Sequence, residues 1–314
     1  MTGSVTPETR CLSFSDAAIA EAASIITHGG IVAVPTETVY GLAGDATSDR
    51  AVAAIYAAKG RPNFNPLIVH VRDLEHAREF GMFDAVAEAL AIGHWPGPLT
   101  LVVPFRPGAG LAAGVMAGLA TVALRVPDHR AMRALLEATR KPLAGPSANA
   151  SGGISPTRAE HVLRSLGGRI PLVIDDGATT GGIESTIVST MNGKISLLRA
   201  GPIVIEGACG HDGTDIVAPG QLAAHYAPAK PLRIDADAAK PDEWHIGFGA
   251  IAGDATLSAT GDLNEAASQL FDLLHRADAS AAPRIAVAPI PHTGIGIAIN
   301  DRLNRAAVGS GKRQ

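Results

Sequence analysis

Segments with helical spacing of apolar residues alternate with short apolar runs over the first two thirds of the chain, and this alternation constrains the fold more than any other feature. Apolar residues recur every three to four positions in residues 15–30, which begin at a capping serine, Ser15, and end at two glycines. The run IVAV follows at once and stops at Pro35, as expected of a buried strand. Because this order repeats up to about residue 205, the sequence predicts an α/β fold.

Further helices and strands are predicted from the same two patterns. Helices are expected at 50–59, 75–81, 84–95, 129–140 and 157–168, and strands at 67–71, 99–105, 121–127, 171–177, 185–189 and 195–201. Thr157 and Glu160 form a capping-box pattern at the start of the last helix. The segment 35–46 has the composition of a loop. Asn192-Gly193 between two strand patterns predicts a hairpin, so the sheet is expected to be mixed rather than purely parallel.

The helix and strand patterns lapse at residues 205–230, which are rich in glycine, proline and alanine. Afterwards the sequence predicts strands at 232–236, 245–251 and 284–290 and helices at 264–277 and 300–307, enough for a second, smaller α/β domain. We therefore predict a main domain at residues 11–208, a linker at 209–230 and a small C-terminal domain at 231–314.

Composition excludes several classes of function. The chain carries a net charge of −4 with a sequence pI of about 6.2, so no overall positive field gathers nucleic acid and any anion site must be local. Its two cysteines, Cys11 and Cys209, form no CxxC motif and no Cys/His cluster, which argues against a zinc site and a disulfide scaffold. No window reaches the roughly 18 apolar residues that a membrane helix needs, and the first residues lack a signal-peptide pattern. We expect a cytoplasmic protein with no membrane contact.

Residues 59–67, KGRPNFNPL, hold a compact set of hydrogen-bond donors directly before a predicted strand. Two prolines stiffen this loop, since proline fixes φ. Lys59, Arg61 and Asn65 could then bind a ligand with little loss of conformational entropy, and a lysine with an arginine suits a phosphate group. The alternative is an ordinary solvated loop, which is the commoner setting for such a pair.

Residues 145–157, GPSANASGGISPT, run from a predicted strand to the start of a predicted helix. Small residues with free N–H groups at such a place can cradle phosphate. The segment matches neither G-x-x-x-x-G-K-[ST] nor G-x-G-x-x-G, so an ordinary flexible connection is the alternative. A second turn of small and polar residues, GIEST at 182–186, precedes a further predicted strand.

Two predicted strands each place one polar residue among apolar ones. Side chains alternate between the faces of a strand, so Arg125 shares a face with Thr121, and His70 shares one with Ile68. Arg199 stands near the end of a third strand. An edge strand with one solvated face would explain each of them, because charged groups are seldom buried. Together with the two loops they describe an anion-binding cleft with several cations and no evident nucleophile, which suits adenylyl or phosphoryl transfer.

Four segments together resemble the YrdC-like L-threonylcarbamoyladenylate synthases: PTETVYGL (35–42), KGRPNFNPL (59–67), GPSANASGGISPT (145–157) and GIESTIVS (182–189). The order, spacing and residue identities of these segments are specific to the family, and the resemblance extends over about residues 15–205. The stretch 218–232, APGQLAAHYAPAKPL, is similar to the linker of the family's long form, and PHTGIGIAINDRLNRAA (291–307) to the end of its extra domain. One departure is Gln221-Leu222-Ala223-Ala224, where the long form usually has cationic residues ahead of His-Tyr.

The resemblance implies a YrdC-like fold, in which a twisted mixed sheet and its helices surround a concave cleft, followed by a small C-terminal Rossmann-like α/β domain. It implies a nucleotidyltransferase that makes L-threonylcarbamoyladenylate and pyrophosphate from L-threonine, bicarbonate and ATP, with Mg²⁺. The product would pass to a separate tRNA threonylcarbamoyl transferase complex, which modifies the adenosine next to the anticodon.

The resemblance also assigns roles to residues by their position in the motifs. Lys59, Arg61, Ser147 and Asn149 are expected as catalytic residues around the nucleotide phosphates. ATP is expected to contact Arg61, Asn65, Thr121, Ser147, Ser155, Arg199 and Tyr226, and L-threonine or its carbamate to contact Thr38, His70, Arg125, Gly145 and Ser185. No metal ligands are predicted. The linker, with His225 and Tyr226, is interpreted as a lid that excludes water, because carbamate and mixed anhydride are labile.

Three other functions stay open at this point. A double-stranded RNA-binding module would use a concave, locally basic surface, although the charge balance speaks against it and leaves at most a weak RNA contact. A carbamoyl-adenylate synthase of the hydrogenase-maturation kind would have a similar domain, but it comes with acylphosphatase and zinc-finger segments that this sequence lacks. An ATP/threonine sensor would bind both ligands without turnover.

Overall fold

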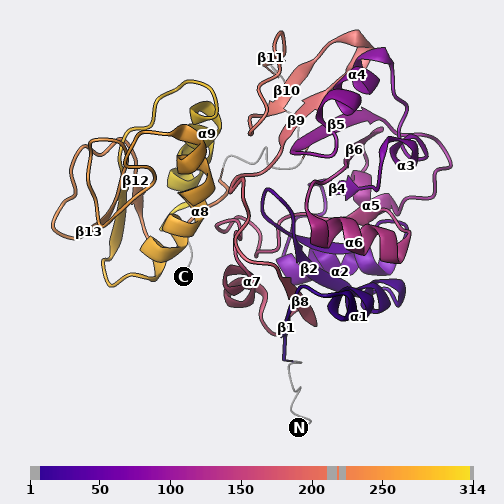
Figure 1. Cartoon of the computed structure of the whole chain (residues 1–314), viewed down its shortest axis with the longest axis horizontal. Coiled ribbons are helices and arrows are strands. Elements are labelled where there is room, and N and C mark those ends of the chain that lie inside the picture. Colours follow the sequence, from indigo (N-terminus) through magenta and orange to yellow (C-terminus); the bar gives the residue numbers. More distant parts are fainter. Residues whose placement is uncertain (1–7, 211–217, 219–223, 312–314) are drawn as a thin grey trace.

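The computed structural model describes residues 8–210, 218 and 224–311. This part of the chain forms a large α/β unit before the linker and a small one after it (Figure 1). Gln221, Leu222 and Ala223, which belong to the departure from the long-form linker, lie outside the described residues. Of the described helices, none is both long and apolar enough to cross a membrane.

The large sheet has eleven described strands, and both the mixed sheet and the predicted hairpin are confirmed. The order across the sheet is β1 (Arg10–Ser13), β8 (Leu172–Asp175), β2 (Ile31–Pro35), β3 (Tyr40–Asp45), β7 (Leu143–Ala144), β4 (Ile68–His70), β6 (Thr121–Arg125), β5 (Leu99–Pro104), β9 (Thr186–Ser189), β10 (Ser196–Arg199) and β11 (Cys209–Gly210). The sheet contains both parallel pairs, such as β4 with β6, and antiparallel pairs, such as β2 with β3. The hairpin pairs β9 with β10 through a short 3₁₀ helix, η1 (Met191–Gly193).

Helices cover the two faces of this sheet unevenly. They are α1 (Asp16–Thr27), α2 (Asp49–Lys59), α3 (Leu74–Arg78), α4 (Ala85–His94), α5 (Ala113–Met116), α6 (Arg130–Thr139) and α7 (Ala159–Leu166). One face packs against α2, α3, α4, α5 and α7. On the other face, α1 and α6 cover the half of the sheet formed by β8, β2, β3 and β7.

The remaining half of that second face is the part of the sheet on which a site can form. It belongs to β4, β6, β5, β9 and β10, and we call it the open half. Its apolar cluster, which contains no helical residue, consists of Ile68, Val102, Ala123, Ile187, Leu198 and Ala218. Because strand side chains alternate between faces, the polar residues that share a face with this cluster are directed away from the covered core.

Local sequence signals explain where several helices begin and end. Ser15 accepts a hydrogen bond from the N–H of Ala18 at 3.2 Å and so caps α1 as predicted. Ser48 caps α2 in the same way, and Gly60 ends that helix in the left-handed conformation, with φ of 59°. The end of α2 therefore fixes the point at which residues 59–67 leave the helix.

Two predictions of local structure are wrong. The segment 35–46 contains β3, which is buried throughout and pairs with β2 and β7. Its glycines suggested a loop, but a Cβ at Gly44 would lie only 3.1 Å from Ile31, so the strand uses glycine for close packing. The capping box at 157–160 is absent: α7 has no side-chain cap, and the N–H of Thr157 instead donates to Nδ1 of His161 at 3.3 Å.

The small unit is a parallel four-stranded sheet with two helices; the sequence predicted both helices and three of the strands, and β14 was not predicted. Its order is β12 (Leu232–Arg233), β15 (Arg284–Val287), β13 (Glu243–Gly247) and β14 (Ala255–Thr256), with α8 (Leu263–Ala279) and α9 (Gly296–Gly309). Both helices lie on the side of this sheet that faces the large unit (Figure 1).

One apolar cluster crosses the boundary between the two units. Val39, Ile154 and Ile183 of the large unit are buried together with residues of α8 such as Leu270 and Phe271. Gly182 lies at this boundary with φ of 70°, and a Cβ there would be 2.4 Å from the Cα of Ser268 in α8. The two units therefore share a core, and backbone meets backbone at the contact.

Substitution of Gly182 by alanine should force the two units apart. We expect Gly182→Ala to lower the free energy of unfolding by about 3 kcal/mol, from the left-handed φ and the overpacking together. Gly177→Ala is the matched control, since Gly177 has φ of 78° and a Cβ added there would meet nothing within 4 Å. We expect Gly177→Ala to lower the free energy of unfolding by about 1 kcal/mol, from the left-handed φ alone. Urea unfolding measures both, and equal losses would show that the contact with α8 is not tight.

Candidate functional site

A cleft on the open half of the sheet brings most of the predicted site residues together. Nine of them line it: Thr38, Arg61, His70, Arg125, Gly145, Ser147, Ser185, Arg199 and Tyr226. Five others do not line it: Lys59, Asn65, Thr121, Asn149 and Ser155. Of these, Thr121 begins β6 on the same face as Arg125, and the other four are buried behind the lining residues and bonded to them or to their loops.

His70 and Arg125 lie side by side at the floor of the cleft. They are register partners on the parallel strands β4 and β6, and both are almost fully buried. The alternative of a solvated edge strand is thus wrong for both, because these strands lie inside the sheet. Burial, with Arg125 nearby, lowers the pKa of His70 to about 3, so the ring is neutral. A Cβ at Gly145 would lie 2.8 Å from Nδ1 of His70, which explains the glycine.

The guanidinium of Arg125 is only partly used by the protein. Its Nε donates to the carbonyl of Gly97 at 3.2 Å, Nη1 to Oγ1 of Thr38 at 3.0 Å, and Nη2 to Oε1 of Glu37 at 2.5 Å. A guanidinium has five N–H donors, so these contacts leave two for a ligand. Two N–H groups on a fixed fork suit a carboxylate.

The loop 59–67, which we call the clamp loop, folds around its own arginine. Arg61 donates from Nε to the carbonyl of Asn65 at 3.1 Å, and from Nη2 to Oδ1 of Asn65 at 2.6 Å and the carbonyl of Pro66 at 2.8 Å. Burial lowers the pKa of Arg61 to about 10, which leaves it charged at neutral pH. Arg61 thus presents its remaining N–H groups to the cleft from a fixed position.

Lys59 does not line the cleft itself; it holds the neighbouring loop, residues 145–153. Its Nζ donates to the carbonyls of Ser147 at 2.5 Å and Asn149 at 2.6 Å. Asn149 in turn accepts from Oγ of Ser147 at 2.6 Å and donates to the carbonyl of Gly153 at 2.9 Å. The predicted contact of Lys59 with phosphate stays a prediction, while the structure shows that its ammonium group ties α2 to residues 145–153.

Arg199, the last residue of β10, is another buried cation of this cleft. Arg199 donates from Nε to the carbonyl of Ser185 and from Nη2 to its hydroxyl, both at 3.1 Å. That hydroxyl also meets Oγ1 of Thr100 at 2.7 Å. Arg199 and Arg61 are both buried on this cleft, so the site is strongly electropositive.

The linker residues His225 and Tyr226 close one side of the cleft. Both are buried, and Tyr226 has φ of 62°, which an aromatic residue rarely adopts. Within the described structure, Nδ1 of His225, the hydroxyl of Tyr226 and Nδ1 of His70 are buried without a hydrogen-bond partner. Such atoms are costly when unpaired, so their gathering at one cleft indicates that a polar ligand completes them.

Sequence reasoning gave no role to two carboxylates, Glu184, which lines this cleft, and Glu37, which bonds to a residue that lines it. Glu37 pairs with Arg125, and its Oε2 accepts from the N–H of Asp128 at 3.1 Å. Glu184 lines the cleft, and its Oε1 accepts from Oγ of Ser155 at 2.5 Å. Both residues stand inside the quoted motifs, but nothing in a motif indicates which distant cation each carboxylate meets.

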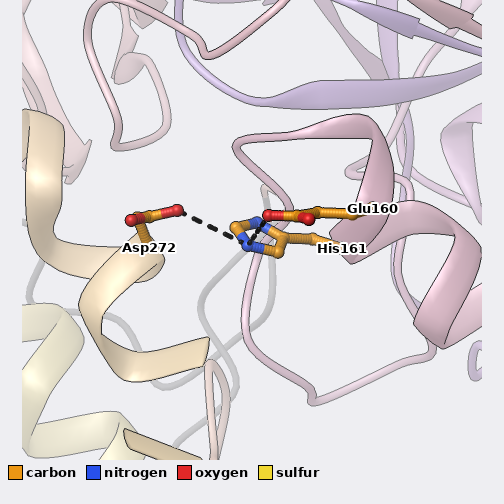
Figure 2. A group of neighbouring side chains, drawn as sticks. All are labelled: Glu160, His161 and Asp272. Carbon is orange, nitrogen blue, oxygen red and sulfur yellow. Dashed lines mark ion pairs between the residues drawn. The ribbon is translucent and has the colours of Figure 1, made fainter. Parts of the chain in front are cut away.

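A separate polar cluster lies where α7 meets α8, and Figure 2 shows its three members, Glu160, His161 and Asp272. Nε2 of His161 lies 3.6 Å from Oδ1 of Asp272, which also accepts from Nε of Arg158 at 2.7 Å. Because Nδ1 of His161 accepts from Thr157, its proton is on Nε2 and faces the carboxylate. The cluster forms a contact between the two units, and it is the only group of metal-ligating type found among the described residues.

Comparisons with known proteins agree with this geometry. The family model described as "Telomere recombination" (Sua5_yciO_yrdC) matches residues 24–201, and the model described as "Threonylcarbamoyl-AMP synthase, C-terminal domain" matches residues 195–308. The threonylcarbamoyl-AMP synthase of Bacillus subtilis is 38% identical, with 95% of each chain covered. The chain belongs to the Sua5/YrdC family of threonylcarbamoyl-AMP synthases.

Other members of the Sua5/YrdC family support the same assignment. The threonylcarbamoyl-AMP synthase of Pyrococcus abyssi is 35% identical, with 91% of this chain and 93% of that protein covered. A crystal structure of P. abyssi Sua5 complexed with L-threonine superposes with a TM-score of 0.88 and 33% identity, over 96% of this chain and 98% of that one. E. coli YciO matches 63% of this chain and 98% of its own length with a TM-score of 0.58, at 20% identity, which shows the fold alone.

Buried neutral histidines should make this family member acid-sensitive. Burial lowers the pKa of His70 and His275 to about 3 and that of His161 to about 4. Unfolded histidine has a pKa near 6.5, so below that pH the unfolded state binds protons that the folded state does not, and stability falls as the pH falls.

The free energy of unfolding should fall between pH 7.5 and pH 5. We expect this fall to be about 2 kcal/mol smaller in His70→Asn, because one such histidine is then absent. Urea unfolding at both pH values measures this change. Asparagine at the exposed His292 is the control and should leave the pH dependence as it is. An identical pH dependence in His70→Asn would show that His70 binds its proton over the same pH range in the folded and the unfolded protein.

Proposed function

We propose that this chain makes L-threonylcarbamoyl-AMP and pyrophosphate from L-threonine, bicarbonate and ATP. The observation that carries the proposal is the cleft itself: an arginine fork with two N–H groups left for a carboxylate lies beside two further buried arginines suited to phosphates. The membership of the Sua5/YrdC family supports the same activity over nearly the whole chain.

Threonine is proposed to occupy the floor of the cleft. Its carboxylate pairs with Arg125, which Glu37 and Thr38 hold in place. Neutral His70, Gly145 and Ser185 surround the amino-acid side, and the unpaired Nδ1 of His70 offers a hydrogen bond there. The positive charge of Arg125 beside this site disfavours the ammonium form, so the threonine amine can be unprotonated and react with CO₂.

ATP is proposed to lie on the side of the cleft that carries Arg61 and Arg199. Arg61 and Ser147 would contact the phosphates, with Lys59 and Asn149 acting on them or on the loop that holds them. Asn65, Thr121, Ser155, Arg199 and Tyr226 are the other ATP contacts that we propose. Fixed cations of this kind stabilise the charge that develops during transfer to phosphorus.

The proposed reaction has two parts. Bicarbonate supplies CO₂ by losing hydroxide. The threonine amine adds to this CO₂ and releases a proton, which combines with the hydroxide to form water, and a carbamate results. A carbamate oxygen then attacks the α-phosphorus of ATP, the bond from that phosphorus to the β-phosphate oxygen breaks, and pyrophosphate leaves. His225 and Tyr226 would exclude water from both labile species, as part of a linker at residues 209–230 between a catalytic domain (11–208) and a C-terminal domain (231–314).

Mg²⁺ is proposed to enter bound to ATP. Glu184 and Glu37, the carboxylates at this cleft in the described structure, already pair with Arg302 and Arg125. The residues present therefore fit a metal ion carried by the phosphates better than one held by protein ligands, and Mg²⁺ commonly binds in that way. It would neutralise part of the triphosphate charge.

The place of this reaction in the cell is also a proposal. The product would pass to a tRNA threonylcarbamoyl transferase complex, and contact with RNA would be weak. We propose the cytoplasm as the compartment, and the free state of Cys11 and Cys209 agrees with a reducing environment.

Pyrophosphate release tests the proposed function directly. The purified protein is incubated with ATP, Mg²⁺ and bicarbonate, with and without L-threonine. We expect release that requires both threonine and bicarbonate, and threonylcarbamoyl-AMP as the second product by mass spectrometry. Release without threonine would mean another acceptor or simple hydrolysis. ATP binding without any release would favour the sensor or the RNA-binding function.

The clamp loop should affect turnover more than threonine affinity. We expect Arg61→Ala and Lys59→Ala each to lower the rate of pyrophosphate release by about 100-fold or more, as loss of one fixed donor does elsewhere. The dissociation constant for threonine, measured by calorimetry, should change less than about threefold, because Arg125 is untouched. Alanine at the exposed Lys194 is the charge-matched control and should change neither. A parallel loss of threonine affinity would contradict the assignment.

A further inference from the structure

Arg302, in α9 of the small unit, is a charged side chain with 0% exposure. Its Nε donates to Oε2 of Glu184 at 3.1 Å, and its Nη1 donates to the carbonyl of Ala200 at 2.5 Å. Both acceptors belong to the large unit. The guanidinium therefore crosses the boundary between the units and ends at residues of the cleft wall.

The contacts of Arg302 hold the cleft wall at three points. Glu184 lines the cleft, and its carboxylate is fixed between Arg302 on one oxygen and the hydroxyl of Ser155 on the other. Ala200 directly follows Arg199, so a fixed carbonyl there fixes the end of β10. The guanidinium carbon also lies 5.5 Å from the ring centroid of Tyr226.

The charge of Arg302 matters as much as its geometry. Glu184 places a carboxylate in a cleft that is otherwise electropositive. Arg302 pairs with Glu184 and also with Asp301, and Asp301 pairs in addition with Arg305, so these two carboxylates and two arginines together add no net negative charge. Unpaired, Glu184 would be a buried anion beside the arginines that are suited to phosphate, and would repel a triphosphate.

A role in stability alone does not explain this arrangement. Replacement of a buried ion pair by apolar residues is often neutral or stabilising, so such a pair is weak evidence for stability. The second ion pair between the units, Arg158 with Asp272, has a half-exposed arginine and touches no residue of the cleft. An ion pair away from the cleft, such as Arg158 with Asp272, can thus hold the two units together without a buried arginine at the cleft.

We propose that Arg302 is a positioning residue for the ATP side of the reaction, so that the C-terminal domain completes the adenylation site. It acts through Glu184, the end of β10 and Tyr226, and it does not touch the reacting atoms. The inference rests on the proposed function, since it assumes that the cleft binds ATP. It assigns to the small unit a part in turnover in addition to any part in stability.

The test compares three variants with a matched control in the full-length protein. Arg302→Met removes the charge, Arg302→Lys keeps it without the planar fork, and the double variant Glu184→Gln with Arg302→Met removes both charges. Arg158→Met is the control, because it breaks the other ion pair between the units. Steady-state pyrophosphate release gives kcat and the KM values for ATP and threonine separately, and thermal unfolding monitors folding.

We expect Arg302→Met to raise the KM for ATP at least tenfold and to lower kcat, with the KM for threonine changed less than threefold. Arg302→Lys should retain most of this defect, since one ammonium group cannot replace Nε and Nη1 together. The double variant should recover at least threefold in the KM for ATP, because no unpaired carboxylate remains. Arg158→Met should match the unchanged protein in all three constants.

Several results would overturn the proposal. One is an Arg302→Lys variant that is folded and has the kinetic constants of the unchanged protein. Another is an equal loss in Arg302→Met and Arg158→Met, which would indicate docking alone. If Arg302→Met fails to fold, Arg302→Lys and the double variant still decide the question. An unchanged protein without threonine-dependent release would refute the proposed function itself, and that result is seen before any variant is measured.

Discussion

Burial of positive charge is the constraint on which the rest of the structure depends. Lys59, Arg61, Arg125, Arg199 and Arg302 are all less than a tenth exposed and lie at or next to one cleft. A buried cation is tolerated only when its N–H groups find acceptors. Main-chain carbonyls and neutral side-chain oxygens, such as those of Asn65, Thr38 and Ser185, supply most of these acceptors. Carboxylates supply the others: Glu37 on Arg125, and Glu184 and Asp301 on Arg302. Carbonyls satisfy hydrogen bonds without cancelling charge, so the cleft keeps a positive excess that a triphosphate can offset.

Much of the fold could be predicted because its signals are local. Capped helices such as α1 and short apolar runs such as β2 can be recognised from about a dozen residues. The hairpin of β9 and β10 was predicted from the dipeptide Asn192-Gly193. β3 was missed because two of its positions are glycines, which weaken any strand pattern; the reason for Gly44 is the proximity of Ile31, a contact across strands. The false capping box at Thr157 failed because His161 competes for the same backbone N–H.

The site shows a similar division. Strand alternation put Arg125 on one face of its strand and His70 on one face of another, and loop composition indicated residues 59–67 and 145–157 as binding segments. The family resemblance then assigned roles to individual residues. None of these could reveal that Arg125 and His70 are register partners, since that depends on the pairing of β4 with β6. Glu184 and Arg302 are 118 positions apart in the chain, and no local pattern connects them. The sequence therefore could not show which carboxylate pairs with which arginine, and so could not show which charges in the site are neutralised.

The shared apolar core has a consequence for shorter members of this fold. Val39, Ile154 and Ile183 stand in the large unit, but their burial depends on α8 of the small one. YciO of E. coli, whose whole length corresponds to less than two thirds of this chain, keeps the fold of the large unit. In any chain that ends after that unit, side chains at these three positions would face water. We therefore expect polar residues at these three positions in such a chain, because apolar side chains there would lose the cover that α8 provides.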